Sequence, residues 1–301
     1  MVGRTLSPIG NLHAGVPQST ILSPLPFSLF MNDIVQATGT EVNLFADDTS
    51  VCASDSSVSR LQQKLQHAVD KLAAWFDSWA LSVNNSKPAF MVFTTKRSMP
   101  SSALAINGQP ISQVLNHKHL GLTFDPHLNW SAHTAPLLCK VSRKIGLLRR
   151  LRCRLPSLVI RALYMVAIRS SVEYATVAWS GIRSGDAQRL ERLQRSATRL
   201  IVGLSVADRL PPALLLSPAG LEPLSLRRQA ACAEFAFRLA SGSCDQLPPH
   251  IAPALSSWQD RLPKSSSSLV LRSAKFGVQR LPRPRTKLFR RSPFYLSFFS
   301  A

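Results

Sequence analysis

Hydrophobic positions in the first part of the chain follow two different periods, which predicts a mixture of strands and helices. Residues 42–52 alternate between apolar and polar side chains, and this predicts two short strands with an acidic pair at or beside the turn between them. Residues 58–79 carry apolar side chains every three or four positions, as one face of an amphipathic helix does. The same reasoning predicts a helix within 21–34, strands at 90–93 and 120–125, and a hairpin over 104–111 around Asn107-Gly108.

After Trp130 the pattern becomes helical and basic. Helices are predicted at residues 132–151, 157–169, 186–204 and 224–240. The segment 241–301 is rich in Ser, Pro and Arg, and we expect it to be mostly disordered. The organisation predicted from these patterns is an α+β region over 1–130, a basic helical region over 131–240 and a tail over 241–301.

Charge separates the first two regions more sharply than hydropathy does. The chain has 301 residues, with 36 Lys and Arg against 16 Asp and Glu and a formal net charge of +20. Residues 1–130 hold eight residues of each sign, so the whole excess lies in residues 131–301. A single-sign field of this strength favours a polyanionic partner, most simply nucleic acid, over a merely solvated basic surface.

Composition excludes several classes of protein. The five cysteines are scattered, with no Cys-x-x-Cys pair, which argues against a disulfide scaffold or a zinc ribbon. Residues 1–10 lack the apolar stretch of a signal peptide, and no apolar run is long enough to span a bilayer. We therefore expect an intracellular protein of the nucleus or cytoplasm with no membrane partner, and its oligomeric state cannot be read from the sequence.

The adjacent carboxylates Asp47 and Asp48 are the strongest candidates for chemistry. Two like charges at one turn repel each other unless a cation lies between them. Mg²⁺ is the natural cation, because it prefers hard oxygen ligands and shares its shell with substrate phosphates. Taken alone, the dipeptide favours a solvated Asp-Asp turn, which is a common feature.

Three other motifs accompany the pair in a fixed order. They are GVPQ at residues 15–18, LSVNNSK at 81–87 and HLGLTFD at 119–125, with FADD at 45–48 between the first two. This ordered set resembles the reverse transcriptases (RNA-directed DNA polymerases) of non-LTR, jockey-like retrotransposons. The resemblance implies a partial polymerase palm, with a short antiparallel sheet and packed helices, over 1–130 and a helical, thumb-like region after it. The implied cofactor is Mg²⁺, and the implied partners are an RNA template, a DNA primer or their hybrid, and a deoxynucleoside triphosphate (dNTP).

Site residues follow from the resemblance position by position. Asp47 and Asp48 would be catalytic metal ligands, and Lys87 would be a general acid toward pyrophosphate. The residues implied in substrate binding are Gly15, Pro17 and Gln18 in the nucleotide pocket, Phe45 and Ala46 beside the primer, and Leu120 and Gly121 in the primer grip. A solvated loop is the alternative interpretation for Lys87, and a packing role is the alternative for Leu120 and Gly121.

The chain also departs from the family pattern. The family places a further catalytic Asp on a strand well before GVPQ, whereas residues 1–14 contain no Asp or Glu. Ser19-Thr20 and Pro26 stand where the family has Gly-Ser and an aliphatic residue. We therefore expect an N-terminally truncated fragment of the two-metal nucleotidyl transferase that is inactive by itself. The alternatives are a non-catalytic protein that binds nucleic acid electrostatically and a marginally folded relic that aggregates.

Overall fold

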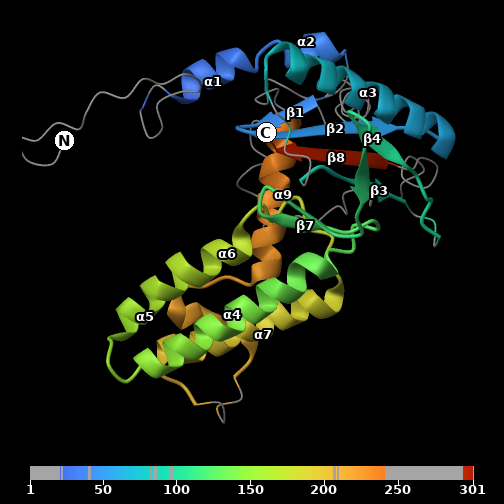
Figure 1. The fold of residues 1–301 in the computed structure, drawn as a ribbon. Coiled ribbons are helices and arrows are strands. Elements are labelled where there is room, and N and C mark those ends of the chain that lie inside the picture. Colours follow the sequence, from blue (N-terminus) through green and yellow to red (C-terminus); the bar gives the residue numbers. More distant parts are fainter. Residues whose placement is uncertain are drawn as a thin grey trace, which may run out of the picture. The chain divides into compact units, whose positions relative to one another are not determined.

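The computed structural model describes residues 21, 23–39, 42–81, 83, 87–94, 96, 98–205, 208 and 210–240, together with the backbone of 294–300. Helices and short sheets are both present, which confirms the α+β class (Figure 1). The chain divides into two compact units. Unit 1 comprises residues 1–115 and 287–301, and unit 2 comprises residues 116–286.

Unit 1 is built on a sheet with the strand order β1-β2-β8-β3-β5-β4. Its strands are β1 (Val42–Phe45), β2 (Asp48–Ser54), β3 (Ala89–Phe93), β4 (Leu104–Ile106), β5 (Gln109–Gln113) and β8 (Phe294–Ser300). β3 pairs with β5 in parallel, and every other neighbouring pair is antiparallel. The predicted β4–β5 hairpin is confirmed, with Asn107 and Gly108 at φ +49° and +76° in its two-residue turn, as that turn type requires.

Three helices belong to unit 1: α1 (Pro24–Phe30), α2 (Ile34–Thr38) and α3 (Val58–Ser78). The apolar stripe of α3 packs on the sheet and forms the core of this unit (Figure 1). Its buried members include Leu61, Leu65, Val69, Leu72 and Phe76, and they meet Phe90 and Val92 of β3 and the β4–β5 hairpin. The polar face of α3 also has a structural role, because the Gln66 amide donates to the carbonyl of Ala105 and accepts from its N–H. This pair of bonds satisfies backbone groups of the edge strand β4.

Two predictions for unit 1 are confirmed only in part. The helix predicted within 21–34 is α1, which ends at Phe30, and a separate helix, α2, begins at Ile34. The side chain of Phe45 is 63% exposed because it lies at the tip of the β1–β2 hairpin. Within the tail expected to be mostly disordered, residues 294–300 form β8, which pairs with both β2 and β3.

Unit 2 begins with a small hairpin, β6 (His117–His119) and β7 (Leu122–Phe124), and continues as helices. The helices are α4 (Ser131–Leu151), α5 (Ser157–Leu163), α6 (Ser170–Glu173), α7 (Ser184–Val202), α8 (Pro212–Leu216) and α9 (Leu224–Ala240), with a 3-10 turn, η2 (Ser217–Ala219), between α8 and α9. A π-helical segment, η1 (Tyr164–Arg169), joins α5 to α6 without a break. The helix predicted at 157–169 therefore exists but continues to Glu173.

The core of unit 2 lies where α4 and α7 pack side by side against the α5–η1–α6 helix (Figure 1). Buried aliphatic residues from each helix fill it, among them Val141, Ile145, Ile160, Ile168, Leu190 and Ile201. Trp179 is fully buried there, and its indole N–H donates to the carbonyl of Tyr174 at 2.9 Å. Trp130 is also buried, which makes it a packing residue and not a platform for stacking bases. No helix in the described parts of the chain has both the length and the apolar character that crossing a bilayer requires.

Candidate functional site

The acidic pair lies at the tip of the β1–β2 hairpin. Phe45 pairs with Asp48 across the hairpin, so Ala46 and Asp47 form its two-residue turn and Asp48 opens β2. This confirms that the pair lies at the turn between two strands. Ala46 adopts φ +52°, a left-handed conformation that costs a non-glycine residue about 1–2 kcal/mol. The tight turn therefore requires some strain at the residue before the two carboxylates.

The carboxylate oxygens of Asp47 and Asp48 can act as ligands to a cation. Asp47 is exposed and Asp48 is half-buried. Within the described residues, neither carboxylate joins an ion pair, whereas Asp55 at the other end of β2 contacts both Arg60 and Lys64. Two free carboxylates fit the donor preference of Mg²⁺, which commonly takes one or two protein carboxylates and completes its shell with water and substrate phosphates. No third His, Cys, Asp or Glu gathers with them among the described residues.

Lys87 lies at the same end of the sheet as Asp48. Both β2 and β3 pair with β8, in which Ser300 is opposite Asp48 and Phe298 is opposite Ala89. Lys87 precedes Ala89 by two residues, so it lies near the level of Asp48, two strand spacings or roughly 10 Å across the sheet. Its side chain is exposed. The nucleotide-pocket residues Gly15, Pro17 and Gln18 lie outside the described residues.

Leu120 and Gly121 form the turn of the β6–β7 hairpin. The sequence predicted a continuous strand over 120–125, but His119 pairs with Leu122 and the two residues between them take φ +46° and +80°. A two-residue turn with both φ values positive is the type that matches the twist of the flanking strands. Tyr174 fixes this turn, because its hydroxyl donates to the Leu120 carbonyl at 2.9 Å and a Cβ on Gly121 would lie 3.2 Å from its ring. The turn thus has a clear packing role in addition to any contact with a primer.

Asp125, which ends the HLGLTFD motif, holds the loop into α4. Its carboxylate accepts backbone N–H bonds from His127, Asn129 and Trp130, at 3.2, 3.0 and 2.7 Å. Trp130 adopts φ +62°, and α4 begins at the next residue. Because both oxygens of Asp125 are occupied by backbone donors, its role is structural.

Helix α4 carries the strongest concentration of positive charge on any described element. It contains five Lys and Arg residues and no Asp or Glu. The spacing places Lys140, Arg143, Lys144 and Arg150 on one side of the helix, and we call these four residues the basic face. None of the four joins an ion pair within the described residues. Lys144 instead donates to the Ala167 carbonyl and to the Ser171 hydroxyl. Partial burial and the neighbouring Lys140 lower the pKa of Lys144.

An open cleft of about 600 Å³ adjoins this face. It is lined by the β6–β7 hairpin, the first half of α4 and the end of the η1–α6 helix, and its polar lining consists of Lys118, Thr123, His133, Lys140, Ser170, Ser171 and Tyr174. No carboxylate lines it. Burial lowers the pKa of His133, and its Nδ1 accepts the Thr123 N–H at 3.4 Å, which leaves the ring proton on Nε2. The cleft therefore presents cations and hydrogen-bond donors, which suits an anionic ligand.

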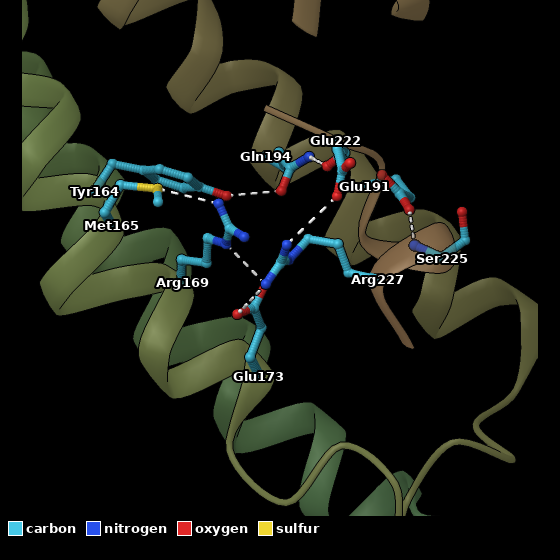
Figure 2. Close-up of polar contacts among 9 residues, drawn as sticks. All are labelled: Tyr164, Met165, Arg169, Glu173, Glu191, Gln194, Glu222, Ser225 and Arg227. Atoms are coloured by element: carbon cyan, nitrogen blue, oxygen red, sulfur yellow. Dashed lines mark hydrogen bonds and ion pairs between the residues drawn. The ribbon is translucent and has the colours of Figure 1, made fainter. Parts of the chain in front are cut away.

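A second polar cluster in unit 2 serves packing. Figure 2 shows Tyr164 donating to Gln194, whose amide donates in turn to the Glu222 carbonyl, at 2.8 and 2.7 Å. In the same view Glu173 accepts from both Arg169 and Arg227. Although burial opposes ionisation, the hydrogen bonds from Arg227 and Arg169 hold the pKa of Glu173 below its usual value. Burial raises the pKa of Tyr164 far above its ordinary range. These hydrogen bonds hold the start of α9 and the residues just before it against α6 and α7.

Comparison with known proteins shows which class of protein part of the chain is similar to. Residues 11–124 match the family Reverse transcriptase (RNA-dependent DNA polymerase). This segment is similar to the reverse transcriptases of jockey-like, non-LTR elements, the same class that the order of the four motifs resembles.

Three relatives from Drosophila melanogaster show how far the likeness extends. The chain is 27% identical over 202 residues to the probable RNA-directed DNA polymerase from transposon BS, covering 63% of this chain and 22% of that protein. It is 26% identical over 204 residues to the corresponding protein from transposon X-element, covering 64% and 22%. It is 32% identical over 135 residues to the RNA-directed DNA polymerase from mobile element jockey, covering 42% and 15%. The chain thus spans about a fifth or less of these relatives, and no solved structure matches it.

Sequence reasoning missed the residues of the cleft. Lys118, His133, Lys140 and Tyr174 are distant in sequence, and they come together only because the β6–β7 hairpin packs on α4 and the α6 turn. One signal was present in the sequence, namely a 21-residue helix with five cations and no carboxylate.

Proposed function

We propose that this chain is part of an RNA-directed DNA polymerase and that unit 2 holds the RNA–DNA hybrid. The observation that carries the proposal is the basic face of α4 beside a cleft that contains cations and hydroxyls but no carboxylate. Phosphate contacts by Lys, Arg, hydroxyl and backbone donors supply affinity without reading sequence. The match of residues 11–124 to reverse transcriptases supports a hybrid over other polyanions.

The proposed chemical role of unit 1 centres on Asp47 and Asp48. When bound, Mg²⁺ supplies charge neutralisation at the reacting phosphates and lowers the pKa of an attacking hydroxyl. Asp47 and Asp48 would hold the ion by their carboxylate oxygens, which the described residues leave without ion pairs. Lys87, exposed at the same sheet end, would donate a proton to the departing pyrophosphate.

The remaining positions have binding roles in this proposal. Phe45 and Ala46 would shape the primer side of the acidic hairpin, and the exposure of the Phe45 ring is compatible with that contact. Leu120 and Gly121 would support the primer strand from the β6–β7 turn. The nucleotide pocket would use Gly15, Pro17 and Gln18.

We further propose that this chain by itself binds a hybrid without extending it. A two-metal transfer needs more ligands than two adjacent carboxylates provide, and the described residues gather no third. Residues 1–14 contain no Asp or Glu to supply one. The function available to the chain alone is therefore electrostatic binding of nucleic acid.

Primer extension tests the catalytic half of this proposal. The chain and its Asp48→Asn variant are compared on poly-rA primed with oligo-dT, with dTTP and Mg²⁺. We expect incorporation by the chain to equal that of the variant. Incorporation clearly above the variant would show that the chain completes a metal site unaided, and it would contradict the proposed lack of extension.

A binding assay on the same hybrid tests nucleic-acid binding separately from primer extension. The Asp48→Asn variant should bind as tightly as the unaltered chain, or slightly more tightly, because it removes a negative charge. Lys118→Gln combined with Lys140→Gln should weaken binding about tenfold or more, since each lysine contributes a phosphate contact. Lys96→Gln, an exposed lysine of unit 1, is the matched control and should bind as the unaltered chain does.

A further inference from the structure

A small cavity in unit 2 lies apart from the cationic cleft. It has a volume of about 170 Å³ and lies between the end of α6 and the first turns of α9. Its polar wall consists of Glu173, Thr176, Arg227 and Arg228, and aliphatic side chains form the rest. A single water needs only about 10–15 Å³ of such space, so the cavity can hold something larger.

Two of the four polar side chains already have their partners. Figure 2 shows that Glu173 accepts from Arg169 and from Arg227, and both of its carboxylate oxygens are engaged. Arg227 also reaches Glu222, with Nη1 3.4 Å from Oε2. The carboxylate of the cavity is therefore neutralised, and it leaves no acceptor for a further cation.

The other two side chains have polar atoms without partners. The Oγ1 of Thr176 and the Nη1 of Arg228 are buried and form no hydrogen bond with any described residue. Thr176 is only 7% exposed, so water outside the protein cannot satisfy its hydroxyl. A buried polar group without a partner costs about 1–3 kcal/mol, and more when it is charged. Partial burial lowers the pKa of Arg228.

The side chains that line the cavity indicate which kind of ligand fits it. Arg228 brings a positive charge and a planar fork of donors, a geometry that matches phosphate and carboxylate oxygens. Thr176 adds a hydroxyl that can donate to the same ligand. The carboxylate of Glu191 acts to raise the pKa of Arg228, but one of its oxygens accepts the Ser225 N–H at 2.8 Å and it forms no ion pair with Arg228.

We propose that this cavity binds a phosphate-class oxyanion between Arg228 and Thr176. The ligand supplies acceptors to both unpartnered donors and neutralises the partly buried guanidinium. Its source is either free inorganic phosphate or a phosphate group of a nucleic acid strand. The site shares no residue with the cationic cleft, so it does not depend on the proposed function.

Titration of the full chain with inorganic phosphate tests this assignment. Binding is followed calorimetrically at constant ionic strength, with chloride as the balancing anion. We expect one saturable site, and we expect Arg228→Met to lose at least tenfold in affinity. Thr176→Val keeps the shape of the side chain and should lose about fivefold, as the removal of one hydrogen bond predicts. Arg192→Met, an exposed arginine of α7, is the matched control and should bind as the unaltered chain does.

Two results would overturn the proposal. One is the absence of saturable phosphate binding, which would mean that water fills the cavity. The other is an equal loss in Arg192→Met and Arg228→Met, which would mean that phosphate associates with the basic surface in general. If Arg228→Met fails to fold, Thr176→Val decides the matter, because retention of full affinity by that variant contradicts the site.

A competing oligonucleotide identifies the source of the ligand. Unphosphorylated (dT)₁₀ is added to the phosphate titration of the unaltered chain and of the Lys118→Gln, Lys140→Gln double variant. Displacement of phosphate in both proteins assigns the site to a backbone phosphate. Unchanged phosphate affinity in both assigns it to the free ion.

Discussion

The carboxylates of unit 2 and the acidic pair of unit 1 differ in whether they have ion-pair or hydrogen-bond partners. Every Asp and Glu of residues 131–240 has a partner, and four of these six join ion pairs with arginine. The other two accept backbone N–H bonds. In unit 1 the adjacent Asp47 and Asp48 form no ion pair within the described residues, although two cations contact Asp55 at the far end of the same strand.

The comparison shows which charged groups of each unit lack an opposite charge among the described residues. In unit 2 the described residues leave the cations of α4 without compensating charge, and the proposed polyanion would supply it. In unit 1 the described residues leave two neighbouring carboxylates without a cation, and the proposed metal ion would supply it. A local imbalance of charge is thus a better guide to function than the net charge of the whole chain.

Truncation of a buried side chain in each core should produce the largest effects. Phe90→Ala in unit 1 and Ile160→Ala in unit 2 each remove a fully buried side chain. The expected losses in free energy of unfolding are about 3–5 and 2–5 kcal/mol. Hydrogen exchange should show that Phe90→Ala weakens α3 and β3 but spares α4 and α7, and that Ile160→Ala does the reverse. Leu158→Ala on the exposed side of α5 should change stability by less than about 0.5 kcal/mol. Equal loss of protection in both units after either substitution would contradict their separation into two cores.

The β6–β7 turn should give an effect of intermediate size. Gly121→Ala forces a Cβ to within 3.2 Å of the Tyr174 ring at φ +80°, so it should destabilise unit 2 by about 1–3 kcal/mol. Gly146→Ala in α4 meets nothing within 4 Å and should stabilise by about 0.5–1 kcal/mol. Thermal unfolding of the two variants checks both signs. A neutral Gly121→Ala would mean that the turn is not held by Tyr174.

The ion pair of Asp55 should give the smallest effect, because its partners are largely exposed. The hydrogen-bonded ammonium of Lys64, with the Ser57 N–H, lowers the pKa of Asp55 to about 2. Since the pKa is depressed in the folded state, the contribution to stability is complete above the unfolded value of 3.8 and is lost as the pH falls through about 2. Asp55→Asn should therefore be less stable than the unaltered chain at neutral pH, and the difference should shrink as the pH falls from 3.8 to 2. A difference that is undiminished at the lower pH would contradict an electrostatic origin, and Lys64→Gln should weaken the pH dependence.

Local patterns predicted most of the secondary structure. The 3.6-residue stripe of α3, the Asn107-Gly108 turn and the position of the acidic pair all follow from short-range rules that tertiary contacts did not override. The strand predicted over 120–125 exists as β7 but begins only at Leu122, because Leu120 adopts a positive φ that its residue type does not favour. The contact that holds it, from Tyr174, lies 54 residues away in sequence.

The site was predictable only in part. The resemblance to reverse transcriptases named Asp47 and Asp48, and the structure places them at a hairpin tip, while their role as metal ligands stays a prediction. The cationic cleft and the Arg228–Thr176 cavity could not be found from sequence, because each joins residues from separate elements. The burial of Thr176 and the exposure of Phe45 also depend on how distant parts of each unit pack together.

The salt dependence of hybrid binding tests the central claim most directly. If unit 2 neutralises about five phosphates, affinity for an RNA–DNA hybrid should fall roughly 10²–10³-fold between 50 and 200 mM salt. Lys140→Gln combined with Arg143→Gln should reduce the slope of log K against log salt by about two, whereas Asp47→Asn combined with Asp48→Asn should leave it unchanged. A slope that is the same after loss of the two α4 cations would contradict the assignment of the nucleic-acid interface to unit 2.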